Sequence, residues 1–128
     1  MTHILPFVRH EQVDGTILLG FADDEFNTKD YLMLQRTLQP SKKDRSLGQD
    51  KIHVELSGRA TYGEIVQVQL GRGYMLLRLD NDTAAHLGES DNAIIIEFDE
   101  KYDYKSLCDV LVLLVGEDRI LTIADSSN

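Results

Sequence analysis

The sequence predicts an α+β domain: an antiparallel β-sheet with one main C-terminal helix packed on it and a short helical turn. Three observations support this prediction. Several short segments alternate apolar and polar residues, as half-buried strands do. Turn signals such as Asp14-Gly15 separate these segments. One stretch near the C-terminus combines a capping aspartate with leucines at helical spacing.

The N-terminal third predicts three strands. Residues 4–10 form the first, and Pro6 places it at a sheet edge or a bulge, because proline cannot donate to a β-ladder. Residues 16–22 follow the turn as the second strand, and residues 23–27 read as a polar loop. Residues 31–37 are apolar on both faces at their start, so we expect a central position for this third strand.

The middle of the chain begins with its most loop-like stretch, residues 39–50, which contains proline, glycine and several charges. Residues 52–56 alternate and predict a half-buried strand. We expect residues 58–61 to turn the chain.

A β-hairpin comes next. Val66, Val68 and Leu70 share one parity and are expected to face the core. The glycines of residues 71–73 suit a tight turn that requires a positive φ. Residues 74–79 then return as the second strand of the hairpin.

The C-terminal third predicts two capped helical segments around a strand. Asp80 or Asn81 is expected to cap a short helical turn, and residues 94–98 form the strand. Asp103 is expected to cap the main helix, although residues 110–115 are β-rich in composition. The core-facing residues of this helix are Leu107, Leu111 and Leu114. A terminal strand is expected near residues 119–123.

Length and composition bound the protein class. The 128 residues suit a single domain, residues 1–128. No apolar stretch approaches the roughly 20 residues that span a bilayer, and the first residues lack the features of a signal peptide. The single cysteine, Cys108, cannot form an internal disulfide. We therefore expect a cytoplasmic protein without a membrane partner.

The charge is strongly acidic, with a formal net value of −9. Residues 80–104 hold eight acidic residues against one basic residue, Lys101, and so account for −7 of this charge. Such a field repels nucleic acids and anionic membranes and favours a basic partner. The alternative is a well-solvated acidic surface without a specific partner.

The order of residues resembles that of the immunity proteins of bacterial polymorphic toxin systems, specifically the tenth numbered family. The resemblance spans roughly residues 17–115. The segments that carry it are Gly20-Phe21-Ala22-Asp23, Tyr31-Leu32-Met33-Leu34-Gln35-Arg36, Tyr62-Gly63-Glu64-Ile65, Leu77-Arg78-Leu79-Asp80, Ala84-Ala85-His86-Leu87-Gly88, Phe98-Asp99 and the closing helix. It implies a non-enzymatic protein that binds a cognate toxin domain stoichiometrically and carries no cofactor.

Candidate partner-binding residues follow from this reading. Glu64 shares the parity of Val66, where a carboxylate requires a hydrogen-bonded partner unless it lies at the strand end and points to water. Tyrosine, as at Tyr62, is favoured in binding hot spots but also covers sheet edges. The acidic segment would dock on a basic toxin. The full set is Tyr62, Glu64, Asp80, Asp82, Glu97, Asp99 and Glu100.

Other functions have weaker support. The histidines His3, His10, His53 and His86 show no metal-ligand spacing, and surface positions are expected for them. No catalytic motif or metal site is predicted. The alternative function is a small self-associating or ligand-binding module without catalytic activity. A ligand pocket between sheet and helix would draw on Glu64 with Arg36 or Arg78, and self-association would give a homodimer.

Overall fold

The computed structural model describes residues 2–47 and 51–122. The elements are β1 (Thr2–Ile4), β2 (Phe7–Val13), β3 (Thr16–Ala22), β4 (Tyr31–Thr37), α1 (Lys42–Ser46), β5 (Ile52–Leu56), β6 (Arg59–Gly63), β7 (Ile65–Gly71), β8 (Tyr74–Leu79), α2 (Asn81–His86), β9 (Ala93–Glu97), α3 (Tyr104–Val115), the 3₁₀ turn η1 (Glu117–Arg119) and β10 (Ile120–Thr122).

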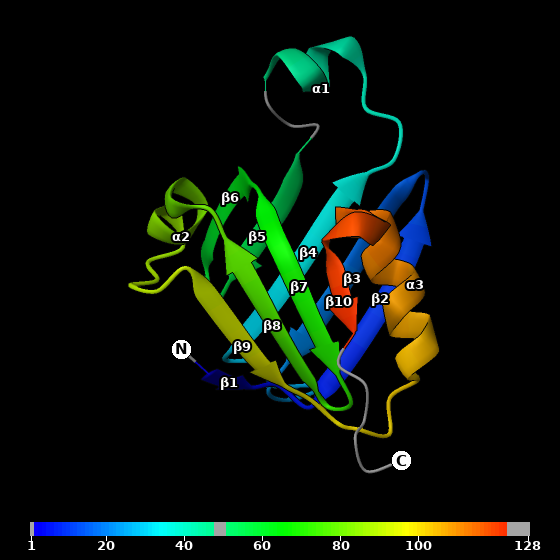
Figure 1. Ribbon diagram of the computed structural model, residues 1–128, viewed down its shortest axis with the longest axis vertical. Coiled ribbons are helices and arrows are strands. Elements are labelled where there is room, and N and C mark those ends of the chain that lie inside the picture. Colours follow the sequence, from blue (N-terminus) through cyan, green and yellow to red (C-terminus); the bar gives the residue numbers. More distant parts are fainter. Residues whose placement is uncertain (1, 48–50, 123–128) are drawn as a thin grey trace.

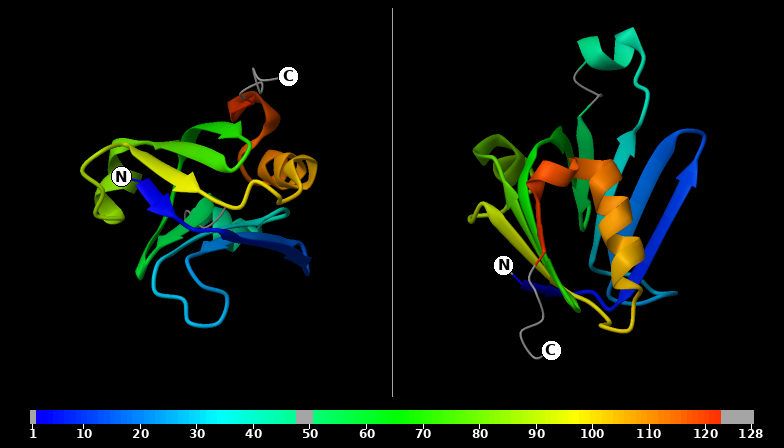
Figure 2. Two further views of the ribbon diagram at one scale, coloured as in Figure 1. Left: turned by 90° about the horizontal axis from the view of Figure 1, so that it is seen from below. Right: turned by 45° about the vertical axis from the view of Figure 1, so that its right-hand side comes forward.

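The strands form two five-stranded sheets that face each other (Figure 1). Sheet A has the order β1-β9-β8-β7-β10, and sheet B has the order β2-β3-β4-β5-β6. The pairs β1–β9 and β7–β10 are parallel and the other neighbours are antiparallel. Figure 2 shows the two layers, with α3 along one side of the sandwich and α2 on the opposite side.

One hydrophobic core lies between the sheets and continues under both longer helices. Sheet A contributes Val68, Leu77 and Ile96, all fully buried, and α3 contributes Leu107 and Leu111. Sheet B contributes the alternating residues Leu19, Phe21, Leu32, Leu34 and Val54, as a strand with one buried face requires.

The α+β class and both capped helices are confirmed. Asp103 accepts hydrogen bonds from the backbone N–H groups of Lys105 and Ser106 at the start of α3, and Asp80 caps α2. No helix among the described residues is long and apolar enough to cross a membrane.

The division into two sheets departs from the single sheet that we expected. Pro6 lies at the first crossing: the chain leaves β1 in sheet A, passes Leu5 and Pro6, and enters β2 in sheet B. Leu5 is fully buried and donates its N–H to the Glu97 carbonyl at 2.8 Å. The predicted first strand is therefore two strands, one in each sheet.

Two local expectations in the middle of the chain are wrong. Residues 59–63 form strand β6, and the turn is confined to Ser57 and Gly58, both with positive φ. Val66 does not face the core and is 52% exposed, because the register shifts between Ile65 and Gln67. Such a bulge reverses the parity of the residues before it, so Ile65 is buried instead.

Two terminal or loop regions are partly described. The predicted loop of residues 39–50 contains the short helix α1, and residues 48–50 lie outside the described residues. The predicted terminal strand is β10, Ile120–Thr122, and Ile123 lies outside the described residues. The predicted central strand, β4, is the middle strand of sheet B.

Candidate functional site

The predicted partner-binding residues fall into two groups at opposite ends of the sandwich. One end carries α1, α2 and the C-terminus of α3, and we call it the α1 end. The other carries the β7–β8 turn, and we call it the hairpin end. The two ends are at least one length of strand β8 apart, which is roughly 17–20 Å at about 3.3 Å per residue. The structure therefore does not bring all predicted residues together.

The group at the hairpin end comprises Glu97, Asp99 and Glu100, all exposed. Glu97 ends β9 opposite Tyr74, and the next residues turn toward α3. Asp99 accepts a hydrogen bond from the Lys101 N–H at 2.9 Å and donates its own N–H to the Pro6 carbonyl at 3.3 Å. These contacts fix the backbone of the acidic turn and leave the carboxylates of Glu97 and Glu100 facing solvent.

The group at the α1 end contains Tyr62, Glu64, Asp80 and Asp82. Asp80 lies under α2 as its N-cap and accepts the Thr83 N–H at 2.9 Å. The Thr83 hydroxyl and backbone N–H, with the nearby Lys51 charge, hold the pKa of Asp80 below its ordinary value. Asp80 therefore has a structural role, whereas Asp82 is exposed in the first turn of α2.

The capping role of Asp80 gives a testable stability difference. Asp80→Ala is expected to lower the free energy of unfolding by about 1 kcal/mol, because the Thr83 N–H loses its acceptor. Asp80→Asn is the control, since asparagine caps helices about as well as aspartate while removing the charge. Urea unfolding of both variants measures the difference. Equal stability of the alanine variant and the unchanged protein would contradict this role.

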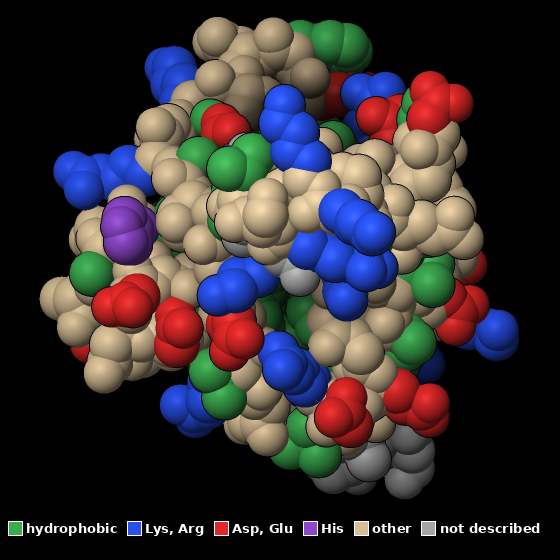
Figure 3. All heavy atoms as spheres, turned by 90° about the horizontal axis from the view of Figure 1, so that it is seen from above, with side chains coloured by type: hydrophobic (Ala, Val, Ile, Leu, Met, Phe, Trp, Pro, Cys, Tyr) green, Lys and Arg blue, Asp and Glu red, His purple; other side chains and the backbone are tan. Residues whose placement is uncertain are grey.

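Glu64 is exposed and lines a pocket of about 460 Å³ at the α1 end. Its backbone N–H donates to the buried Thr83 hydroxyl at 3.0 Å, which ties the β6–β7 crossing to α2. Three cationic side chains line the same pocket: Arg36, Lys51 and Arg119. Figure 3, which looks onto this end, shows Lys and Arg side chains gathered around the hollowed centre of the face.

The two arginines of this pocket are held by backbone carbonyls. Arg36 donates from Nη1 to the Leu114 carbonyl at 3.1 Å, near the C-terminus of α3, and Arg119 donates from Nη1 to the Ile65 carbonyl at 3.0 Å. The Arg36 guanidinium is stabilised at the end of α3, because helix C-termini carry a partial negative charge. Glu64 and Arg36 both line this pocket, while Arg78 does not. Its described lining includes no nucleophile paired with a base.

The sequence predicts a polar loop at residues 23–27 but assigns it no functional role. In the structure the β3–β4 loop, residues 23–30, lies at the hairpin end (Figure 1). Its tip presents Phe26 with 91% of its surface exposed. The carboxylate of Asp24 accepts the N–H groups of Phe26 at 2.9 Å and Asn27 at 2.8 Å. The hydrogen bond from Asn27, and to a smaller extent that from Phe26, lowers the pKa of Asp24. A large aromatic residue within an otherwise polar loop was the signal in the sequence.

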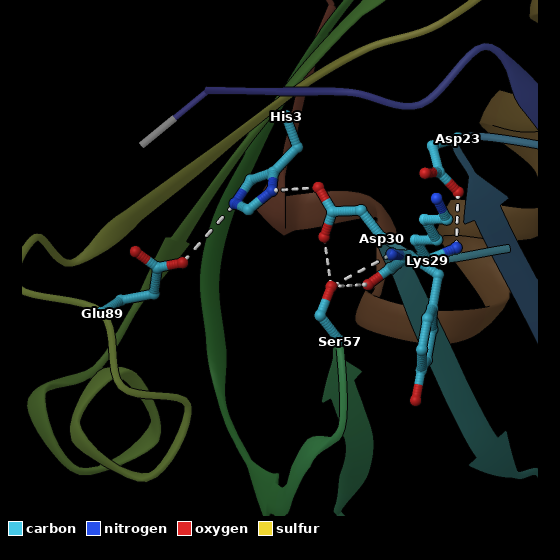
Figure 4. A network of polar contacts seen from close by, with 7 residues as sticks. His3, Asp23, Lys29, Asp30, Ser57 and Glu89 are labelled. Atoms are coloured by element: carbon cyan, nitrogen blue, oxygen red, sulfur yellow. Dashed lines mark hydrogen bonds and ion pairs between the residues drawn. The ribbon is translucent and has the colours of Figure 1, made fainter.

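His3 connects this loop, which joins two strands of sheet B, to strand β1 of sheet A. Its side chain is only 10% exposed, so the expected surface position is wrong. Nδ1 contacts the Asp30 carboxylate at 3.0 Å and Nε2 lies 3.6 Å from the Glu89 carboxylate (Figure 4). The Ser57 hydroxyl also donates to Asp30. Burial raises the pKa of Asp30, but the hydrogen bonds from Ser57 and His3 outweigh it and lower the pKa. Asp30 thus anchors the C-terminal end of the loop.

Comparison with known proteins identifies one family. A family model described as Immunity protein 10 matches residues 6–104, about three quarters of the chain. The matched region runs from Pro6 to the first residue of α3 and includes all the predicted partner-binding residues. No curated protein matches the sequence. Among the described residues, no group of three or more histidine, cysteine, aspartate or glutamate side chains is arranged to hold a metal ion.

Proposed function

The chain belongs to the immunity protein 10 family of bacterial polymorphic toxin systems, and from this premise we propose that it neutralises a cognate toxin domain by stoichiometric binding. The match over residues 6–104 is the observation that carries the proposal. The protein would act in the cytoplasm of the cell that it protects. Because neutralisation requires only that the toxin be held or its active site be covered, no catalytic residue is needed.

Charge supports this proposal. The net charge of −9 produces a long-range attraction for a basic toxin domain and accelerates their encounter. The proposed contacts at the hairpin end are Glu97, Asp99 and Glu100, and those at the α1 end are Tyr62, Glu64 and Asp82. Asp80 would contribute through the position of α2. Attraction of this kind weakens as ionic strength rises, because the Debye length falls to about 3 Å at 1 M salt.

Co-expression tests the proposal directly. Any toxin-like C-terminal domain encoded beside the gene for this chain is expressed in a host with and without the protein. We expect growth to be restored in its presence and a one-to-one complex to co-purify. The association rate should fall as salt is raised from about 0.05 to 0.5 M. A toxic domain that this protein neither binds nor neutralises would refute the proposal.

The pocket at the α1 end favours one alternative function, a module that binds a small anionic ligand. Arg36, Lys51 and Arg119 supply positive charge there, although Glu64 and Asp118 oppose it. Native mass spectrometry of the purified protein distinguishes this reading. A retained small molecule, with no affinity for the toxin domain, would favour the ligand-binding module.

A further inference from the structure

The outer face of sheet B carries an apolar groove at the hairpin end. The groove has a volume of about 750 Å³ and lies over β2, β3 and β4, beside the β3–β4 loop. Its apolar lining includes Phe7, Leu18, Tyr31 and Met33. In Figure 2, none of the described helices covers this face of the sheet, and the loop projects from it. Phe7 remains 44% exposed, so apolar area is available at the mouth of the groove.

The loop beside the groove presents Phe26 in a fixed backbone conformation. Asp24 binds the N–H groups at the tip, and Asp23 accepts the N–H of Lys29 at 2.9 Å. At the C-terminal end of the loop, Asp30 is held by His3 and Ser57 (Figure 4). Because the backbone is ordered before any partner arrives, contact through Phe26 costs little additional conformational entropy. An aromatic side chain that is 91% exposed on such a loop is suited to fill a recess in another protein.

Negative charge surrounds these apolar residues. The groove itself is lined by Glu11, Asp24 and Glu25, against one base, Arg9. The acidic turn of residues 97–100 adjoins it, because the Asp99 N–H binds the Pro6 carbonyl directly before Phe7. A partner surface that complements this end must therefore carry Lys and Arg side chains around an apolar recess.

We infer that the groove and the Phe26 loop form the docking surface for the cognate toxin domain, with Phe26 as the apolar anchor and the surrounding carboxylates as the rim. This assignment rests on the proposed function, which supplies the partner. A second copy of the chain is a poorer occupant, because two such acidic surfaces placed face to face repel each other.

Removal of the anchor is the first test. Phe26→Ser should weaken binding to the purified toxin-like domain by about 30-fold, the loss typical of a binding hot spot. Leu47→Ser is the matched control, because Leu47 is also an exposed apolar residue (59% exposed) but follows α1 at the opposite end. The control should bind within about twofold of the unchanged protein. Circular dichroism and thermal unfolding establish that both variants fold.

Charge reversal is the second test. Glu97→Lys with Glu100→Lys should slow association and reduce its salt dependence, because both carboxylates lie on the proposed rim. Glu117→Lys with Asp118→Lys makes the same charge change in η1 at the α1 end, at two exposed residues outside the proposed toxin contacts, and should have a smaller effect. This comparison separates local contact from the overall charge of the protein.

The outcomes distinguish the two proposals. If the unchanged protein fails to bind or neutralise the domain, the proposed function is refuted, and this assignment fails with it. If the unchanged protein binds but Phe26→Ser binds equally well, only the docking surface is wrong. Sedimentation that reveals a dimer lost on Phe26→Ser would also overturn the assignment, since it identifies a second copy as the occupant.

Discussion

Replacing Leu111 with alanine is expected to lower the free energy of unfolding by about 2–5 kcal/mol. Leu111 is fully buried on α3, and this helix packs against β3 and β4 of sheet B and β10 of sheet A. The substitution removes apolar contacts in the close-packed core and leaves a cavity there. Urea unfolding followed by circular dichroism measures the loss, which should be visible as a lower midpoint with a similar slope.

Leu113→Ala provides the matched control for this prediction. It makes the same chemical change two residues away on the same helix, but Leu113 is 42% exposed. Helix propensity changes equally in the two variants, so their difference reports the contribution of burial alone. We expect Leu113→Ala to cost well under half as much. Similar losses in both variants would contradict the placement of α3 with Leu111 facing the core.

The local elements were predictable because their signals lie close together in the sequence. At Asp14 and Gly15, φ values of 52° and 78° match the turn that the dipeptide predicts. The helix α3 was predictable from Asp103 and the spacing of its leucines, despite the β-rich composition of residues 110–115. In that case capping and tertiary burial together outweigh local β-propensity.

The division into two sheets was not predictable for a physical reason. A strand alternates buried and exposed residues whichever sheet it joins, so periodicity does not reveal its neighbours. The chain changes sheets at Leu5 and again at Glu64, with only one or two residues between strands in each case. Neither crossing has a loop long enough to mark it. The bulge at Val66 was also hidden, since its sequence continues an unbroken alternation.

The candidate site shows the same limit. Asp82 and Glu97 belong to one acidic segment of the sequence, yet strand β9 carries them to opposite ends of the molecule. Phe26 is more than 70 residues from Asp99 in sequence and lies at the same end, because β2 pairs with β3 and Pro6 contacts Asp99. Charge patterning therefore predicts an acidic surface, while only the tertiary structure shows which of its charges lie at the same end of the molecule.

Gly63→Ala is the second large effect that we expect, a loss of about 1–3 kcal/mol from overpacking. A Cβ atom at this position would lie 2.2 Å from Oγ1 and 2.8 Å from Cγ2 of Thr83. Thr83 is itself only 2% exposed and accepts the Glu64 N–H, so it cannot move without breaking that hydrogen bond. The strain must therefore displace α2 relative to β6, and with it the exposed Asp82.

A double-mutant cycle separates this overpacking from the general effect of alanine in a strand. Thr83→Ala removes both atoms of closest approach, so Gly63→Ala should cost less in that background, with a coupling energy of about 1 kcal/mol or more. Gly20→Ala is the control, because a Cβ atom there meets only the Arg9 carbonyl at 3.9 Å. Glycine also loses more backbone entropy on folding than alanine, so this control should be neutral or slightly stabilising. If Gly63→Ala proved as harmless as Gly20→Ala, then α2 does not pack on β6 as closely as described, and the positions of Glu64 and Asp82 are not fixed by Thr83.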